Sequence, residues 1–281
     1  MFGSMELRRG THSCSQARHY GTLLLVIMGV GCDKTFVVGT CEPPTVPTAD
    51  AGTDDGGTGA GSDTLPIELP WSSGFESGFC DFAEPLGYCY QRGTASFKLV
   101  TSPVHSGTFA AAFAVNSDTN AQGTQARCVR QGTLPARAKY GAWYYVPQIP
   151  TADGFWNLFH FEGQAPGVDW RGLWDVQLNL GSDGQLRLTV YDFVTPRQID
   201  LPEAPPIPIA TWFHVEFYFA RASDETGQIT LLQDGETLLD LSGVRTDDRQ
   251  WGRWFVGNLA INQLPLLNTV FVDDVTIDAT P

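Results

Sequence analysis

Basic residues are scarce in this chain of 281 residues. Lysine and arginine number 17 against 31 aspartates and glutamates, which gives a formal net charge of −14. Proteins that bind nucleic acid present a basic surface to the phosphates, so we expect no nucleic-acid partner. The same deficit argues against electrostatic binding to an anionic membrane, although it leaves room for a small basic pocket.

Helical periodicity is also lacking in the region after residue 68. Short segments there alternate apolar and polar residues with period two and are bounded by turn residues. The turns "GSDG" at 181–184 and "DETG" at 224–227 separate candidate hairpin partners. Many short strands in one domain predict an all-β fold, either a sandwich, a jelly roll or a barrel.

The N-terminal apolar run is too short to span a bilayer comfortably. It reads "GTLLLVIMGVGC" at 21–32, follows several basic residues and has the length of a secretory signal core. Its small residues lead into Cys32, which resembles a bacterial lipoprotein signal in which the cysteine becomes the lipidated N-terminus. We therefore predict a signal peptide at 1–31 and an exported outer-membrane or cell-surface lipoprotein that contacts the membrane only through its lipid. A secreted or periplasmic protein is the alternative.

Large apolar residues are nearly absent from "EPPTVPTADAGTDDGGTGAGSDTLP" at 42–66. Such a segment cannot bury enough apolar surface to offset the entropy lost on ordering. We predict a disordered linker over 32–68, then one domain over 69–281, and we expect a monomer.

The chain has no Cys-x-x-Cys and no closely spaced histidine pair, so its six cysteines do not indicate a zinc site. They fit an exported protein with disulfides. Outside the signal and Cys32, the remaining cysteines are Cys41, Cys80, Cys89 and Cys128, and three pairings are open. Cys80–Cys89 is the preferred pair because it closes the shortest loop.

Several segments, taken in order along the chain, resemble a known superfamily. They are "GFESGFCDF" at 74–82, "TSPVHSGTFAAAFAV" at 101–115 and "VFVDDVTID" at 270–278. Together they resemble the concanavalin A-like lectins and glucanases, and within these the heparin-lyase-type and alginate-lyase-type polysaccharide lyases. The resemblance implies a jelly roll of two antiparallel sheets with a groove for an acidic or neutral polysaccharide, and it requires no cofactor.

Alternation sorts the side chains of "FWNLFHFE" at 155–162 into two faces. We expect one face to be buried between the sheets and the other to form either solvated surface or a sugar groove. The first face carries Phe155, Asn157, Phe159 and Phe161, and the second carries Trp156, Leu158, His160 and Glu162. The polar faces of the next two segments carry Asp175, Gln177 and Asn179, and Arg187, Thr189 and Tyr191.

β-Elimination on a uronic acid needs a base, an acid and a group that neutralises the carboxylate. His160 is the candidate base because imidazole titrates near neutrality. Tyr191 is the candidate acid for the leaving oxygen. Arg187 and Gln177 are the candidates that hold the carboxylate, since arginine offers a bidentate fork. The competing interpretation is that these are ordinary cross-strand neighbours on an exposed sheet.

The resemblance adds two correspondences. "NLFHF" stands where related lyases have a Gln-x-His strand, with Leu158 in place of the glutamine. Arg127 stands at the arginine of an Arg-x-Glu element, with Val129 in place of the glutamate. Because aromatic, amide and charged side chains suit sugars, the candidate substrate-binding residues are Trp156, Glu162, Asp175, Asn179 and Arg127.

Two other functions remain open. A non-catalytic carbohydrate-binding or adhesion module would use the same groove without cleavage. A glycoside hydrolase needs two carboxylates that flank the scissile bond, and the Glu-x-Asp-x-x-Glu run of the related glucanases is absent, so we rank hydrolysis last.

The resemblance also implies a structural calcium ion that ties the first and last strands. Glu76 and Asp274 match the ligand positions, and carboxylate oxygens suit Ca²⁺. The alternative is that the acidic pair at 273–274 only keeps an edge strand from pairing with another molecule.

Overall fold

The structure is a computed structural model that describes residues 65–117, 123–151, 154–165, 167, 169–247, 249 and 251–280. The predicted signal peptide, Cys32 and the linker up to residue 64 lie outside the described residues. Within the described residues, no helix is long and apolar enough to cross a membrane. Near the start of the described residues, Pro66 bridges to Thr133, and Ile67 is buried in the core.

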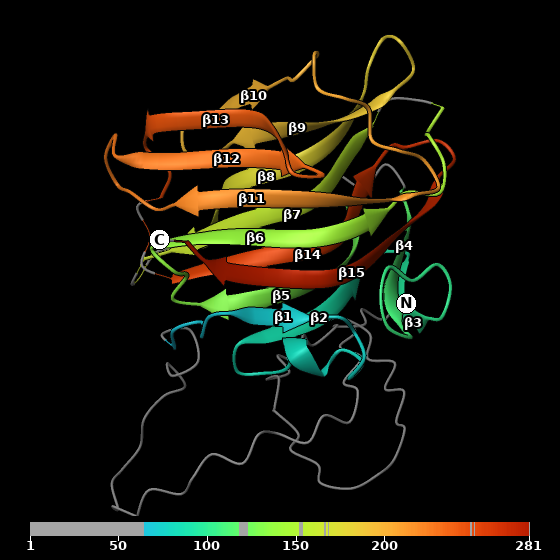
Figure 1. The fold of residues 1–281 in the computed structure, drawn as a ribbon, viewed down its shortest axis with the longest axis horizontal. Helices are drawn as coiled ribbons and strands as arrows, with labels where there is room; N and C mark the ends of the chain where they lie inside the picture. The colour runs from blue at the N-terminus through green and yellow to red at the C-terminus, as the bar shows by residue number, and fades with distance from the viewer. Residues whose placement is uncertain are drawn as a thin grey trace, which may run out of the picture. The chain divides into compact units, whose positions relative to one another are not determined.

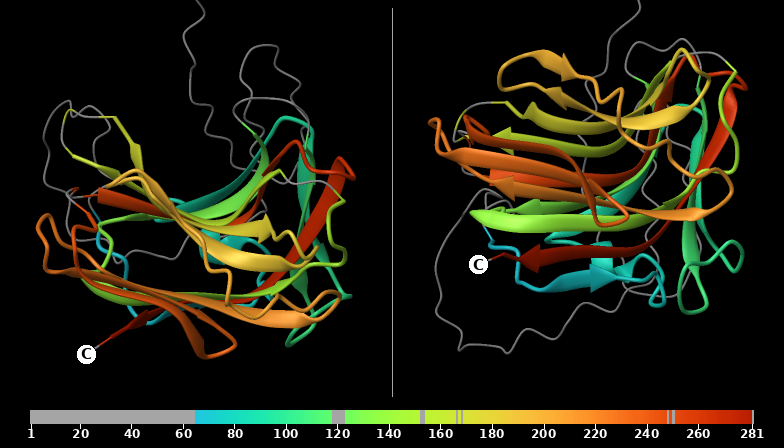
Figure 2. Two further views of the ribbon diagram at one scale, coloured as in Figure 1. Left: turned by 90° about the horizontal axis from the view of Figure 1, so that it is seen from above. Right: turned by 45° about the horizontal axis from the view of Figure 1, so that its top comes forward.

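Over the described residues, the chain forms two antiparallel sheets that face each other (Figure 1). The eight-stranded sheet has the order β13 (Glu236–Val244), β12 (Gly227–Gln233), β11 (Trp212–Ala220), β6 (Arg137–Tyr145), β15 (Leu267–Ala279), β4 (Ala110–Asn116) and β3 (Ala95–Val100), and β1 (Trp71–Ser73) also pairs with β15. The seven-stranded sheet has the order β10 (Arg197–Ile199), β9 (Leu186–Asp192), β8 (Arg171–Leu180), β7 (Phe155–Gln164), β14 (Trp251–Ile261), β5 (Thr124–Gly132) and β2 (Gly87–Arg92). A short 3₁₀ turn, η1 (Cys80–Phe82), precedes β2. The predicted all-β jelly-roll sandwich is confirmed, and Figure 2 shows the two layers from above.

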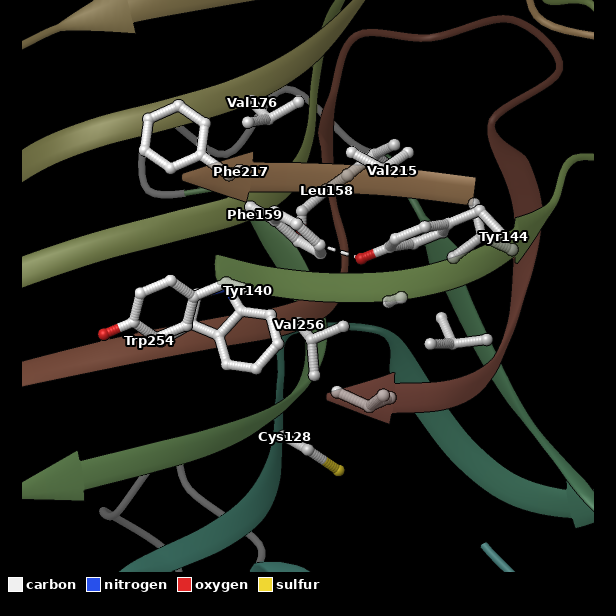
Figure 3. Packing of buried hydrophobic residues seen from close by; sticks show 14 of the residues in the cluster. Cys128, Tyr140, Tyr144, Leu158, Phe159, Val176, Val215, Phe217, Trp254 and Val256 are labelled. Carbon is white, nitrogen blue, oxygen red and sulfur yellow. Dashed lines mark hydrogen bonds between the residues drawn. The ribbon is translucent and has the colours of Figure 1, made fainter. Parts of the chain in front are cut away.

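Aromatic side chains from both sheets fill the space between them (Figure 3). Tyr140 of β6 packs edge-on against Trp254 of β14 at 5.0 Å between ring centroids, and Trp254 meets Phe159 of β7 at 5.1 Å. The hydroxyl of Tyr144 donates to the backbone oxygen of Leu158 at 3.1 Å. Burial of these rings removes a large apolar area from water and joins the sheets into one core.

A β-bulge in β7 changes which side chains face the core. The pairing of β7 with β8 shifts register between Asn157 and Phe159, so strict alternation fails there. Trp156 is only 2 % exposed, and its Nε1 donates to the Asn258 side chain inside the core. Phe155 is 38 % exposed. The predicted placement of Trp156 beside His160 on one face, and of Phe155 in the core, is therefore wrong.

The described disulfide joins Cys89 of β2 to Cys128 of β5, which lie opposite each other in the sheet. Cys80 is also disulfide-bonded, but not to Cys89. The preferred pairing of Cys80 with Cys89 is wrong because β2 pairs with a strand far along the chain. The bridge fixes the edge strand β2 to the sheet that carries the site.

Candidate active site

A cleft of about 330 Å³ opens on the outer face of the seven-stranded sheet. Its walls come from β2, β5, β14, β7 and β8, together with Phe193, which follows β9. These strands are neighbours in the sheet but come from separate parts of the sequence. The described lining has three parts, namely a histidine held by carboxylates, a set of arginines and a set of aromatic rings.

His160 lies between two carboxylates. Its Nδ1 is hydrogen-bonded to Asp175 Oδ1, and its Nε2 lies 3.2 Å from Glu162 Oε1. Asp175 stands opposite His160 on β8 and is 2 % exposed, and its second oxygen accepts from Gln177 Nε2 at 3.1 Å. The side chains of His160 and Glu162 keep 16 % and 23 % of their surface exposed. Asp175 thus fixes the ring from behind, while Nε2 and Glu162 face the cleft.

The carboxylates control the ionisation of His160. Burial alone would lower the pKa of His160, but the charge and hydrogen bond of Asp175 and the contact with Glu162 raise this pKa to about 9. Burial of Glu162 opposes its ionisation, yet the hydrogen bond and charge of His160, with a contribution from Arg253, hold the pKa of Glu162 below its usual value. At neutral pH His160 is therefore an imidazolium and Glu162 a carboxylate.

Cationic side chains surround this cluster. Arg127 is 3 % exposed and donates to Asn157 Oδ1. Arg253 lies with its guanidinium 3.8 Å from the ring centre of Trp170, and its Nη1 is 4.0 Å from Glu162 Oε2. Arg92 also lines the cleft. With protonated His160, the cations of the described lining outnumber its carboxylates, which makes the cleft locally positive on an acidic protein.

Aromatic rings form the floor and the far wall. Phe255 of β14 lies between Tyr90 and His160, with ring centroids 6.4 Å from the first and 5.2 Å from the second. The Tyr90 hydroxyl donates to Gln125 Oε1 at 2.7 Å. Burial raises the pKa of Tyr90 far above its usual value, although the charge of Arg127 opposes this. Tyr90 is therefore a neutral phenol, and Phe255 offers an apolar surface for a sugar ring.

The structure brings some of the predicted residues together. His160, Glu162 and Arg127 line the cleft, and Asp175 lies directly behind His160. Gln177 contacts Asp175, so it orients the histidine pair rather than reaching into the cleft centre.

Other predicted residues lie outside the cleft. Arg187, the predicted carboxylate holder, makes hydrogen bonds of 3.0 and 2.7 Å to Asp183 and donates to the backbone oxygen of Ala204, and it does not line the cleft that contains His160. Tyr191 pairs with Asp175 across β8 and β9, but its ring packs on Phe193 at 4.6 Å and is not part of the lining. Asn179 lines an adjacent hollow.

The sequence reasoning did not identify several lining residues. Most stand on β2 and β14, where "GYCYQR" and "RWFVGN" do alternate and could have placed them on one face. Asn157 reaches the cleft only because of the bulge in β7. The missed residues are Tyr88, Tyr90, Arg92, Gln125, Phe155, Asn157, Phe193, Arg253, Phe255 and Leu259.

The predicted calcium ligands contact a loop instead. Glu76 Oε1 accepts from the backbone N–H groups of Thr108 and Phe109 at 2.7 and 2.9 Å. Asp274 Oδ2 lies 2.6 Å from His105 Nδ1. Within the described part of the chain, no group of three or more His, Cys, Asp or Glu side chains is placed to hold a metal. Ca²⁺ needs oxygen ligands where this arrangement presents N–H donors, so these residues as placed do not fit the ion.

Comparison with known proteins supports the fold. The endo-β-1,4-glucuronan lyase of the fungus Trichoderma reesei superposes with a TM-score of 0.55 and 18 % identity, over 70 % of this chain and 92 % of that protein. The alginate lyase Aly36B gives 0.47 and 14 % over 62 % and 82 %. The PL-14 alginate lyase of Aplysia kurodai gives 0.47 and 11 % over 66 % and 87 %.

These structural neighbours are polysaccharide lyases with a jelly-roll fold. At such identities the likeness is one of fold. No family model and no curated protein matches the chain.

Proposed function

We propose that this protein binds an acidic polysaccharide in the cleft and cleaves it by β-elimination next to a uronic acid. The observation that carries the proposal is that His160, fixed by Asp175, lines one cleft together with arginines and a tyrosine phenol. A base, carboxylate-neutralising cations and a proton donor are the parts that this reaction needs. The fold shared with the glucuronan lyase agrees with this choice.

His160 is the base in this proposal. Asp175 retains the proton on Nδ1, so deprotonation frees the lone pair of Nε2 on the cleft side. Nε2 then takes the C5 proton of the uronate, the C4–O4 bond breaks, and its electron pair leaves with O4 while C4=C5 forms. Because the pKa of His160 is about 9, the reaction is favoured by alkaline pH.

Arginines neutralise the uronate carboxylate as charge develops at C5. The Arg253 side chain is 22 % exposed and can reach a bound carboxylate. Arg127 is buried in the cleft wall and adds positive charge behind the bound carboxylate. A guanidinium binds a carboxylate in bidentate fashion and stabilises the developing enediolate. Tyr90, a neutral phenol on the far side of Phe255 from His160, is the candidate acid in place of Tyr191. To protonate O4, its hydroxyl must exchange its hydrogen bond to Gln125 Oε1 for one to the substrate.

The second candidate function is a binding module without catalysis. In the structure both ring nitrogens of His160 contact carboxylates, so Nε2 carries a proton that Glu162 stabilises and offers no lone pair until that proton is lost. If Glu162 keeps this contact with substrate bound, the cleft would hold an acidic glycan without cleaving it. Hydrolysis fits less well, because Asp175 is 2 % exposed and cannot flank a scissile bond.

The experiment is an ultraviolet assay for the unsaturated uronate that β-elimination produces. The purified protein is incubated with glucuronate-containing polysaccharides and with the same polymers after carboxyl reduction. We expect absorbance to rise only with the acidic polymers. Binding without product would favour the module, and no binding to any acidic polymer would contradict both functions.

Export and lipid attachment at Cys32 remain proposals that rest on the N-terminal sequence. The monomeric state is likewise a proposal. No structural calcium is proposed, because the donor set at Glu76 does not fit the ion. Radiolabelled fatty acid incorporated by the full chain, but not by Cys32→Ala, would establish the anchor.

A further inference from the structure

Two further hollows extend the cleft across the described sheet face. A hollow of about 310 Å³ shares Phe155 with the cleft, and another of about 260 Å³ shares Asn179 with the first. Phe155 is 38 % exposed at the junction with the cleft. The three hollows therefore lie next to one another, and a polymer that leaves the cleft past Phe155 would meet them in turn toward β8 and β9.

The charge changes along this path. The described side chains of the middle hollow are uncharged, and its polar members are the amides Gln177, Asn179 and Gln198. The far hollow contains Arg187, but Asp183 neutralises it through two hydrogen bonds, and Asp200 adds a second carboxylate. The path thus runs from a cationic cleft through a neutral hollow to an acidic one.

We infer that this gradient selects a mixed polysaccharide, in which the uronate held in the cleft is followed by neutral sugars. The inference rests on the proposed function. Amides donate to and accept from sugar hydroxyls, so the middle hollow suits a neutral pyranose. A polyuronate would place a second carboxylate against uncompensated Asp200 or among amides that cannot neutralise it.

The magnitude follows from charge repulsion at a partly exposed site. One like-charge contact costs about 1 kcal/mol at close range in a watery environment. We therefore expect the mixed polymer to bind about five- to tenfold more tightly than the polyuronate. Because salt screens exposed charges, the preference should shrink as ionic strength rises.

The test compares three probes by affinity electrophoresis of the wild-type protein. They are polyglucuronate, a copolymer in which glucuronate alternates with a neutral hexose, and that copolymer after carboxyl reduction. Gln198→Arg places a cation in the middle hollow, where it can neutralise a second carboxylate. This variant should therefore bind polyglucuronate more tightly, and the difference in affinity between the copolymer and polyglucuronate should become smaller. Ser242→Arg, exposed on β13 of the other sheet, is the control of equal charge and should leave it unchanged.

The outcomes separate the two claims. Tighter binding of the copolymer, narrowed by Gln198→Arg alone, supports the inference. Equal or tighter binding of polyglucuronate overturns the inference and leaves the proposed function standing. Equal binding of the carboxyl-reduced copolymer, or no binding of any probe, overturns the proposed function and the inference with it.

Discussion

His160 and Glu162, two residues apart on β7, point to the same side of the sheet with His160 Nε2 3.2 Å from Glu162 Oε1. On its other nitrogen His160 is held by Asp175 from β8. The contact with Glu162 lies on the cleft side, and the contact with Asp175 lies behind it. Glu162 therefore controls when the proposed base becomes available, while Asp175 controls where it points.

The activity should depend on pH through His160. We expect kcat/KM of the wild type to rise with pH and to level off above an apparent pKa of about 9, because His160 must lose a proton that Asp175 and Glu162 stabilise. Glu162→Gln removes one carboxylate and should move the profile to lower pH. A pH–rate profile of both proteins measures this, and an unchanged or upward-shifted profile in Glu162→Gln would contradict the assignment.

The stability should depend on the same group. Folding raises the pKa of His160 from 6.5 to about 9. The stabilisation by protonated His160 is therefore fully present below about pH 6.5 and is lost as pH rises through about 9. The contribution amounts to about 3 kcal/mol of unfolding free energy. Denaturant unfolding at several pH values should show the loss in wild type and not in His160→Gln. If the unfolding free energies of the two proteins changed with pH in the same way, His160 would not be the source of this stabilisation.

The two tyrosines should differ in their effect on turnover. Tyr90→Phe removes the proposed proton donor from the cleft and should lower kcat by about 100-fold or more with a small change in KM. Tyr191→Phe is the matched control. Tyr191 packs on the lining residue Phe193 but does not itself line the cleft, so this variant should keep most of the activity. Steady-state kinetics of both variants test this prediction. A larger loss of kcat in Tyr191→Phe than in Tyr90→Phe would indicate that Tyr191 is the acid.

Substitution of Trp156 should mainly lower stability, whereas substitution of Phe255 should mainly weaken glycan binding. Trp156→Ala leaves a cavity in the core and should cost about 3–5 kcal/mol of unfolding free energy. Phe255→Ala removes an aromatic surface from the cleft and should weaken glycan binding at a smaller stability cost. Thermal unfolding and affinity electrophoresis of both variants test this. If a folded Trp156→Ala lost glycan binding while Phe255→Ala kept it, the main binding surface would be the hollow of about 310 Å³ that Trp156 also lines, and not the cleft.

The fold was predictable because period-two alternation and turn residues are local signals. The pairing of His160 with Asp175 was also within reach, since β7 and β8 are consecutive in the chain. Tyr90 and Arg253 were not found, because their place beside His160 depends on the order β7–β14–β5–β2, which no local pattern gives.

Two further errors have local causes that the sequence does not reveal. The bulge at Asn157 inserts one residue, and this exchanged the expected places of Phe155 and Trp156. Arg187 does lie on a polar strand face, but the nearby turn supplies Asp183 as its partner. The alternation of apolar and polar residues predicts on which face of a strand a side chain lies. It does not predict which charged residue from a nearby turn will pair with that side chain.

The central claim is tested most directly by comparing wild type and His160→Gln on one acidic polysaccharide at about pH 9, with binding and product measured on the same samples. The account predicts that both proteins bind the polymer and that only the wild type generates the ultraviolet-absorbing unsaturated uronate. Equal rates of product formation in the two proteins would contradict it.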